Sequence, residues 1–374
     1  MRRLITISKG LFALAVVLGL AAWLVFRLPS FGGVSDGQRL ERMQQSKQFI
    51  HARFENTPPY ISNFSLAGEL RAYFGDQARE PSFDVPVVKM SAELLINPAA
   101  QGLRVWWLGH ASTLIEIDGV RILTDPVFSR RVSPFQWVGP ARLHPAPLAL
   151  EQWKNIDAVV ISHDHFDHLD MDTIRHLATQ GTHFYVGLGI GAHLERWQVP
   201  VGQIHEMDWW DQAIVKGVTI FCTPARHYSG RKSMNNSTLW ASWMFKSARH
   251  SAYFSGDTGY APHLKAIRER LGNPQLALIK IGAYGDTWLD IHMNPESAVQ
   301  AHLDLGATTL LPIHWATFNL AYHEWAEPIV RAQAAALKHG VQLVTPRPGE
   351  KFEFGLPFEN RAWYLPGPPT VRVP

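Results

Sequence analysis

The chain has 374 residues, of which 46% are apolar and 18% are charged, and this composition excludes a largely disordered protein because it supplies a sizeable core. Its formal net charge of +3 is close to neutral for the length and gives no support to a protein dedicated to binding nucleic acid. Cys222 is the single cysteine, which excludes an intramolecular disulfide framework and a cysteine-rich zinc module.

The first segment carries basic residues, followed by an apolar run over residues 10–26. A helix of that length nearly reaches across a hydrocarbon core of about 30 Å. We therefore expect residues 1–28 to be a signal-anchor, with a cleaved signal peptide as the alternative. Arg2 and Arg3 favour a cytoplasmic N-terminus, which places the rest of a membrane-associated protein on the exported, periplasmic side. Basic residues after the run, such as Arg27, leave the cytoplasmic face open as an alternative.

We interpret residues 29–102 as a linker and an N-terminal arm. Residues 29–37 are rich in Gly, Pro, Ser and Asp, which is typical of a linker. Apolar and basic residues are interspersed over residues 38–54, and this pattern predicts a basic amphipathic helix that packs on the domain or lies on a membrane surface. Residues 64–97 show no period and are expected to wrap the domain as an irregular segment.

From residue 103 the pattern changes, and we expect one large domain over residues 103–360 and a tail over residues 361–374. Short apolar or alternating runs predict strands at 103–108, 113–117, 120–123, 156–161, 184–186, 218–222, 240–245, 252–255, 276–281 and 309–312. Helices are predicted at 171–179, 294–304 and 325–337, the second with Asn294 as its N-cap and Pro295 at its first position. Many strands followed by alternating strands and helices suit an α/β fold in which helices sandwich two sheets.

A dense group of potential metal ligands follows the predicted strand at 156–161. His163 and His165 are two residues apart on an extended segment, so their side chains point the same way and can share one metal ion. Asp167 and His168 come after the turn and can reach a second metal ion. Imidazole nitrogen and carboxylate oxygen are both zinc ligands, so the string predicts a two-metal site at the end of a strand.

Four side chains cannot complete two metal sites, and three later residues are candidates for the missing ligands. His227, Asp257 and His314 each follow a predicted strand. Each is a weak indication by itself, because a histidine after a strand is usually a surface residue and residues 255–259 can also form a plain tight turn.

Nine short blocks, in order, resemble the N-acylphosphatidylethanolamine-hydrolysing phospholipase D family of the metallo-β-lactamase superfamily. They include Trp-Leu-Gly-His-Ala-Ser, Gly-Asp-Thr-Gly-Tyr and Pro-Ile-His-Trp, and they lie at residues 107–112, 123–126, 128–129, 138–140, 208–210, 223–227, 256–260, 281–284 and 312–315. The resemblance covers about residues 103–352. It implies an αββα fold of two mixed sheets, and a hydrolase domain over 103–360.

The resemblance also implies a site with two zinc ions, without excluding other divalent metals. One zinc would take His163, His165 and His227. The other would take Asp167, His168 and His314, and Asp257 would bridge the two ions. A hydroxide held between two zinc ions is a nucleophile at neutral pH, and Asp167 is placed to orient it.

Three further residues are candidates for roles near the metal ions. Asp125 is expected to support a ligand histidine, or else to form a turn before Pro126. His292 is a catalytic candidate that meets the substrate phosphate, or else a surface histidine. Tyr284 is a catalytic candidate as a polar residue lining the site. Six tryptophans are expected mainly in the core, with an acyl-chain channel as the alternative for some: Trp106, Trp107, Trp209, Trp210, Trp240 and Trp243.

The expected activity is zinc-dependent hydrolysis of N-acylphosphatidylethanolamine, or a related phospholipid, by a phospholipase D-type phosphodiesterase. A sugar-phosphate lactonase or another phosphodiesterase of the same superfamily is the alternative, because the same nucleophile attacks a carbonyl carbon. A non-catalytic, membrane-tethered scaffold is the alternative of a different class. We expect a phospholipid and a membrane as partners and no nucleic acid, and we leave a homodimer open.

Overall fold

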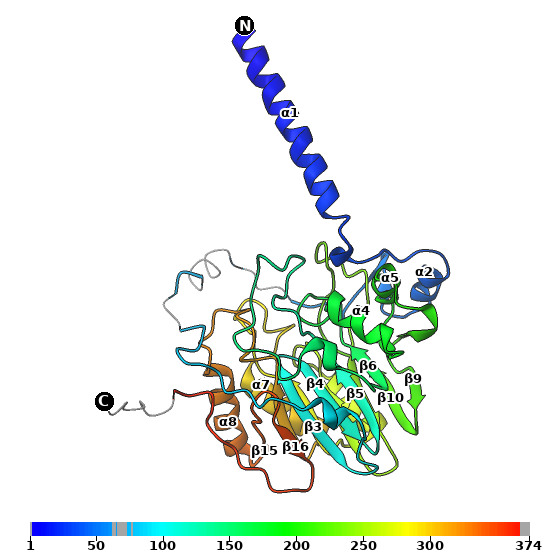
Figure 1. Ribbon diagram of the computed structural model, residues 1–374, viewed down its shortest axis with the longest axis vertical. Helices are drawn as coiled ribbons and strands as arrows, with labels where there is room; N and C mark the ends of the chain where they lie inside the picture. Colours follow the sequence, from blue (N-terminus) through cyan, green and yellow to red (C-terminus); the bar gives the residue numbers. More distant parts are fainter. Residues whose placement is uncertain (1, 62–64, 66–72, 76–77, 367–374) are drawn as a thin grey trace, which may run out of the picture.

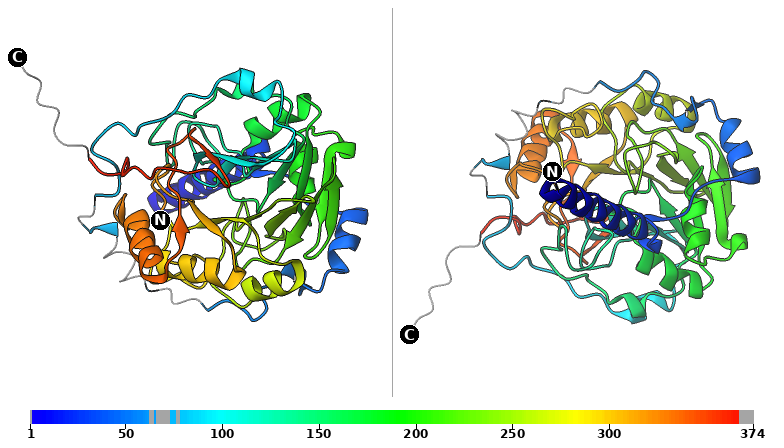
Figure 2. Two further views of the ribbon diagram at one scale, coloured as in Figure 1. Left: turned by 90° about the horizontal axis from the view of Figure 1, so that it is seen from below. Right: turned by 90° about the horizontal axis from the view of Figure 1, so that it is seen from above.

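Two seven-stranded sheets lie face to face, and helices cover their outer faces (Figure 1 and Figure 2). The computed structural model describes residues 2–61, 65, 73–75 and 78–366. The largest core cluster takes buried side chains from both sheets, including Trp107 and Ile115 on one sheet and Trp243 and Leu278 on the other. The α/β architecture expected from the order of strands and helices is therefore confirmed.

The first sheet combines an antiparallel half and a parallel half. Its strands, in spatial order, are β16 (Lys351–Glu353), β3 (Leu103–Gly109), β4 (Ser112–Ile117), β5 (Val120–Thr124), β6 (Ala158–Ile161), β7 (His183–Gly187) and β8 (Ile204–Met207). Asp118 and Gly119 connect β4 to β5 with φ angles of 45° and 88°, as a two-residue turn with left-handed central residues requires.

The second sheet is also mixed, with parallel pairing from β12 to β15 and antiparallel pairing from β9 to β12. Its strands, in spatial order, are β15 (Gln342–Leu343), β14 (Thr309–Ile313), β13 (Leu276–Lys280), β12 (Ser251–Phe254), β11 (Ser242–Lys246), β10 (Val218–Thr223) and β9 (Gln212–Val215). The short strands β8, β9, β15 and β16 are absent from the sequence-based prediction, because two to four residues carry too little pattern.

The outer layers are helical. They consist of α4 (Met171–Thr179), α5 (Gly191–Arg196), α6 (His263–Leu271), α7 (Pro295–Leu305) and α8 (Glu327–His339), with 3-10 turns at η3 (Leu150–Gln152) and η4 (Val201–Gln203). Helix α7 begins as predicted, because Asn294 Oδ1 accepts a hydrogen bond of 2.9 Å from the Ser297 amide and Pro295 takes the first position.

The N-terminal region differs from the prediction over residues 38–54. Helix α2 (Gly37–Gln44) is short, and a hairpin of β1 (Phe49–Ile50) and β2 (Arg53–Phe54) follows it. The predicted single helix is therefore wrong beyond Gln44. Phe54 is fully buried in a cluster with Met43 and Trp240, and this packing outweighs the local helical pattern.

Helix α1 (Arg2–Val25) projects away from the rest of the molecule (Figure 1). Within the described residues, no helix is both long enough and apolar enough to cross a membrane. After α1, the 3-10 turn η1 (Pro29–Phe31) packs on the domain, where the Trp197 indole donates a hydrogen bond of 2.7 Å to the Pro29 carbonyl.

The arm and the tail are only partly within the described residues. The irregular segment predicted over residues 64–97 includes positions outside them, and its described part contains the 3-10 turn η2 (Ala92–Leu95). Trp363 and Tyr364, from the segment predicted as a tail, are buried and pack against the Trp315 ring.

Candidate metal centre

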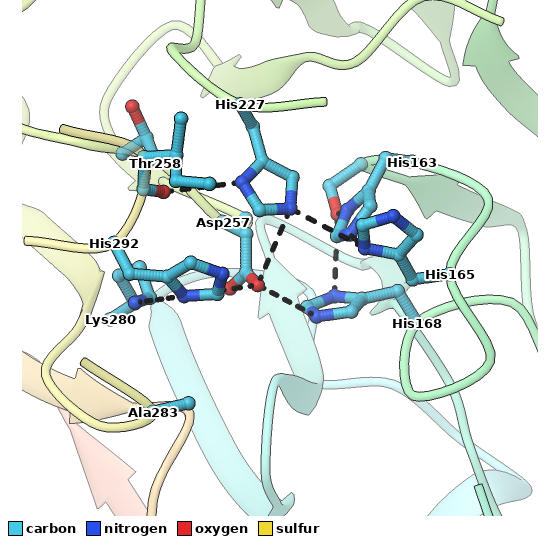
Figure 3. A network of polar contacts seen from close by, with 12 residues as sticks. His163, His165, His168, His227, Asp257, Thr258, Lys280, Ala283 and His292 are labelled. Carbon is cyan, nitrogen blue, oxygen red and sulfur yellow. Dashed lines mark hydrogen bonds and ion pairs between the residues drawn. The ribbon is translucent and has the colours of Figure 1, made fainter. Parts of the chain in front are cut away.

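The predicted metal ligands converge where strands of both sheets end. Figure 3 shows His163, His165, His168, His227 and Asp257 facing one another. The segment from His163 to His168 follows β6 of the first sheet. From the second sheet, His227 follows β10, Asp257 follows β12 and His314 follows β14. The fold therefore brings all seven predicted ligand residues to one place.

The side chains form two groups of potential ligands. The first contains His163, His165 and His227, and the second contains Asp167, His168, His314 and also His110. Within each group the ligand atoms lie within 4.8 Å of one another. The same distance limit holds for two smaller sets that include Asp257 and overlap these groups: His163, His168 and Asp257, and His227, Asp257 and His292.

Asp257 contacts both groups, as a bridging ligand would. Its carboxylate oxygens lie 2.9 Å from His314 Nε2, 3.4 Å from His168 Nε2 and 3.8 Å from His227 Nε2. The separation of the ligands into two groups with Asp257 between them agrees with the arrangement implied by the family resemblance.

The contacts between histidines fit metal binding. His163 Nε2 lies 2.8 Å from His165 Nδ1, and His168 Nε2 lies 3.1 Å from His314 Nε2. Two facing imidazole nitrogens share at most one proton, so at least one nitrogen of each pair presents a lone pair at this place. Burial holds the pKa of His163 and of His227 well below the ordinary value, which keeps these rings neutral as metal ligation requires.

Asp167 and Asp257 stay ionised although they are buried, because positive charge on neighbouring histidines stabilises them. Burial alone would raise the pKa of Asp167, but neighbouring histidines, His168 foremost, hold it well below its ordinary value. The pKa of Asp257 is likewise held down against burial, by His314 and then His168. In turn, and against burial, the same carboxylates, Asp167 foremost, hold the pKa of His168 well above its ordinary value. Imidazoles beside ionised carboxylates are a donor set that zinc and similar divalent ions take, and His168 would give up a proton when it binds one.

Asp125 supports the second group from behind. Its Oδ2 lies 2.6 Å from His168 Nδ1, and its Oδ1 accepts a hydrogen bond of 2.7 Å from the Ser162 amide. Asp125 is fully buried, so the pair orients the His168 ring and leaves Nε2 facing the other ligands. The contact expected between Asp125 and a ligand histidine is thus present.

His110 is a member of the centre that the sequence analysis did not identify. Its Nε2 lies 2.9 Å from Asp167 Oδ2, and its carbonyl accepts a hydrogen bond of 2.8 Å from the His314 amide. Burial foremost lowers the pKa of His110 to about 3, which makes it a neutral donor to Asp167. Its place directly after β3 resembles that of the other ligands and is the signal that could have revealed it.

His292 lines the cavity beside the centre, as expected, and has an unpredicted partner. Lys280 Nζ lies 2.7 Å from His292 Nδ1 and donates a hydrogen bond of 2.9 Å to the Gly282 carbonyl. Lys280 is fully buried at the end of β13, and burial lowers its pKa to about 8. A lone lysine in the apolar run of residues 276–281 is the sequence signal for this contact.

Tyr284 does not line the cavity, which corrects the expectation for this residue. Its hydroxyl donates a hydrogen bond of 2.5 Å to Glu327 Oε1 and lies 3.1 Å from Arg331 Nη1. Its ring stacks on His323 at 4.7 Å. Helix α8 supplies both polar partners of the hydroxyl, so Tyr284 is turned toward that helix.

A cavity of about 600 Å³ opens beside the two groups, and its lining includes His165, Asp167, Asp257, His292 and His314. None of the six tryptophans considered for an acyl-chain channel lines it, although all six are within the described residues. Four are buried in the core: Trp106, Trp107, Trp240 and Trp243. Trp288 lines the cavity instead.

Comparisons with known proteins agree with this geometry. The family described as "Beta-lactamase superfamily domain" matches residues 120–315, which is more than half of the chain. "Uncharacterized protein Rv0906" of Mycobacterium tuberculosis is 42% identical, over 97% of this chain and 99% of its own length. "N-acyl-phosphatidylethanolamine-hydrolyzing phospholipase D 1" of Caenorhabditis elegans is 36% identical, over 60% of this chain and 67% of its own length.

A solved structure has the same fold. Igni18, described as a novel metallo hydrolase from the archaeon Ignicoccus hospitalis, superposes with a TM-score of 0.54 at 24% identity, over 69% of this chain and 100% of that chain. The chain is a metal-dependent hydrolase that belongs to the beta-lactamase superfamily and is related to the N-acylphosphatidylethanolamine-hydrolysing phospholipases D.

Proposed function

We propose that the protein is a zinc-dependent phosphodiesterase that cleaves N-acylphosphatidylethanolamine or a related phospholipid on the phospholipase D side. The products are a phosphatidic acid and an N-acylethanolamine. One observation carries the proposal: two groups of ligands, with Asp257 between them, lie on a cavity whose remaining walls include Tyr60, Ile61 and Trp288.

In the proposed mechanism, His163, His165 and His227 would hold one zinc ion, and Asp167, His168 and His314 would hold the other. Asp257 lies between the two groups and would be available to both. Two bound zinc ions would supply a nucleophile from water near neutral pH and neutralise charge on the phosphodiester oxygens. His110 donates to Asp167 and keeps this carboxylate oriented while it remains ionised. Asp125 does the same for the ring of His168.

His292 is the proposed hydrogen-bond donor to a substrate oxygen. Because the Lys280 ammonium has no lone pair, His292 Nδ1 accepts in their contact, and the ring proton is on Nε2. The ring lines the cavity, so Nε2–H is available to a phosphodiester oxygen or to the departing alkoxide.

Helix α1 is the proposed contact with the membrane. Its apolar side chains, among them Phe12, Val17 and Leu24, are exposed, and the helix projects from the domain (Figure 1). Burial of these side chains in a lipid surface would keep the enzyme beside its substrate. We retain the exported, periplasmic side as the proposed location of the catalytic domain, with the cytoplasmic face as the alternative.

A product-release assay tests the function. Zinc-loaded protein is incubated with N-acylphosphatidylethanolamine in mixed micelles, and N-acylethanolamine is measured by mass spectrometry. Asp167→Asn should lower the rate at least about 100-fold with the fold retained, whereas Asp172→Asn, on the exposed side of α4, should not. Hydrolysis of a sugar-phosphate lactone without any phospholipid cleavage would replace the proposal by the lactonase alternative.

A further inference from the structure

Residues 53–61 form a wall of the cavity, although they lie outside the segment that matches the family. Their contribution to the lining consists of Arg53, Glu55, Asn56, Pro59, Tyr60 and Ile61. The matched segment, residues 120–315, supplies all seven predicted metal ligands but not this wall.

Hydrogen bonds from Arg226 hold this wall, residues 53–61, against the rest of the domain. Its guanidinium donates hydrogen bonds of 2.6 Å to the Pro58 carbonyl and 2.9 Å to the Pro59 carbonyl. The same guanidinium pairs with both carboxylate oxygens of Asp290, at 2.9 Å and 2.6 Å. Asp290 in turn accepts a hydrogen bond of 2.6 Å from the Ile61 amide. The chain is thus held by its backbone, and the Tyr60 and Ile61 side chains are left for other contacts.

The wall is also joined to a metal-ligand residue. Asn56 Nδ2 donates a hydrogen bond of 2.7 Å to the His227 carbonyl, and Asn56 Oδ1 accepts one of 3.2 Å from the His227 amide. Asn56 is buried, so this paired contact is shielded from water. It sets the distance between the wall and the metal centre.

The end of the wall from Pro59 to Ile61 is apolar, whereas Arg53 and Glu55, at its other end, are charged and pair with each other. Ile61 is 67% exposed and Tyr60 is 43% exposed, and Met234, from the loop after β10, is 74% exposed on the same cavity. Trp288, Leu320, Ile291 and Ala283 also contribute to the apolar lining. Exposed apolar side chains that gather on one cavity indicate an apolar ligand, because their burial is favourable.

The charges of the lining argue against a nucleotide. Arg53 is the only lysine or arginine among the described lining residues, and it pairs with Glu55 at 3.0 Å. A second phosphate would therefore meet no free cation in this cavity. The cavity volume of about 600 Å³ is typical of a pocket for one small molecule. It accommodates part of a lipid with several acyl chains and not the whole molecule.

We propose that residues 53–61 form a specificity wall that binds one acyl or alkyl chain of the substrate against Tyr60 and Ile61, beside the metal centre. The proposal rests on the proposed function, since it assumes a substrate that carries a phosphoryl group at the metal ions. Recognition of the chain is thereby assigned to a segment that holds no metal ligand.

Binding of linear alkylphosphonates, from ethyl to octyl, tests the wall without requiring turnover. Isothermal titration calorimetry on the zinc-loaded full chain should show that affinity rises about fourfold for each methylene group that enters the cavity. Ile61→Ala and Tyr60→Ala should each reduce the gain from ethyl to octyl by about tenfold. Tyr60→Phe should preserve the gain, because it keeps the ring.

Ile214→Ala is the matched control, since Ile214 is 71% exposed on β9 and does not line the cavity. It should reproduce the wild-type series. The proposal that this wall binds an alkyl chain would be wrong if affinity rose equally from ethyl- to octylphosphonate in wild type and Ile61→Ala. It would also be wrong if affinity in wild type did not rise with chain length. If affinity rises with chain length as expected but the protein hydrolyses no phosphodiester, the proposed function is wrong and the proposal that residues 53–61 bind an alkyl chain still holds.

Discussion

Lys280 Nζ lies 2.7 Å from His292 Nδ1, and this contact fixes which nitrogen of His292 carries the proton. Lys280 is fully buried, and within the described part of the chain its ammonium forms no ion pair with a carboxylate at 4.0 Å or less. A buried cation without such a pair costs free energy, which suggests that the contact serves the site rather than stability.

Replacing Lys280 by Met should lower kcat/KM for the phosphodiester by about 10- to 100-fold, because His292 then loses its preferred tautomer. Unfolding should remain a single cooperative transition, since Met fills the same space. Lys246→Met is the control, because Lys246, at the end of β11, donates to the Leu271 carbonyl at the end of α6 and is not among the described residues that line the cavity. Equal losses in both variants would contradict the positioning role. Differential scanning calorimetry and steady-state kinetics on the same samples provide the measurements.

The number of zinc ions bound per chain should depend separately on each of the two ligand groups. Dialysed and reconstituted wild-type protein should hold about two zinc ions per chain, and His314→Ala should hold about one. A free zinc concentration about 100 times the Kd should stabilise the fold by about 2.7 kcal/mol for each occupied site. Plasma mass spectrometry and thermal unfolding measure these effects. His339→Ala, at the end of α8, serves as the control. A His314→Ala protein with undiminished zinc would show that His314 is not a ligand.

Asp125→Asn should weaken metal binding without removing a ligand. The carboxylate that accepts from His168 Nδ1 becomes a neutral amide, so the affinity of the second group should fall about 10- to 100-fold. Activity should return when zinc is added in excess, which loss of the fold would not permit. The exposed Asp84→Asn variant should behave as wild type in the same zinc titration. If excess zinc restores nothing, Asp125 acts in some other way.

Deleting residues 2–25 tests the proposed role of α1. The truncated protein should no longer float with phospholipid vesicles in a density gradient, because it has lost the exposed apolar side chains of that helix. It should still hydrolyse a water-soluble phosphodiester, since none of the described residues that line the cavity comes from α1. Unchanged flotation of the truncated protein would assign membrane binding to another surface.

The sequence predicted those parts of the site that a local pattern specifies. The ligands from His163 to His168 are adjacent in the chain and follow a strongly apolar strand, and the Asn294 cap precedes Pro295 directly. His110 was missed because its partner, Asp167, is 57 residues away. The same limit applies to Asn56 and His227, which are 171 residues apart.

Other errors came from packing that overrides local preference. Nothing in residues 38–54 indicates that Phe54 will be buried against Trp240, so the helical pattern was extended too far. Tyr284 stands in a block that resembles a family motif, but its direction depends on Glu327 and Arg331, which lie on a later helix. Neither outcome can be read from spacing, because both depend on long-range contacts.

Each ligand group draws on both sheets, since β6 leads to one part of each group and β10 or β14 leads to the rest. Neither half of the protein can therefore bind a metal ion with a complete set of ligands before the halves have docked. Metal binding would therefore follow the docking of the two sheets, and a bound ion would stabilise only the correctly assembled fold.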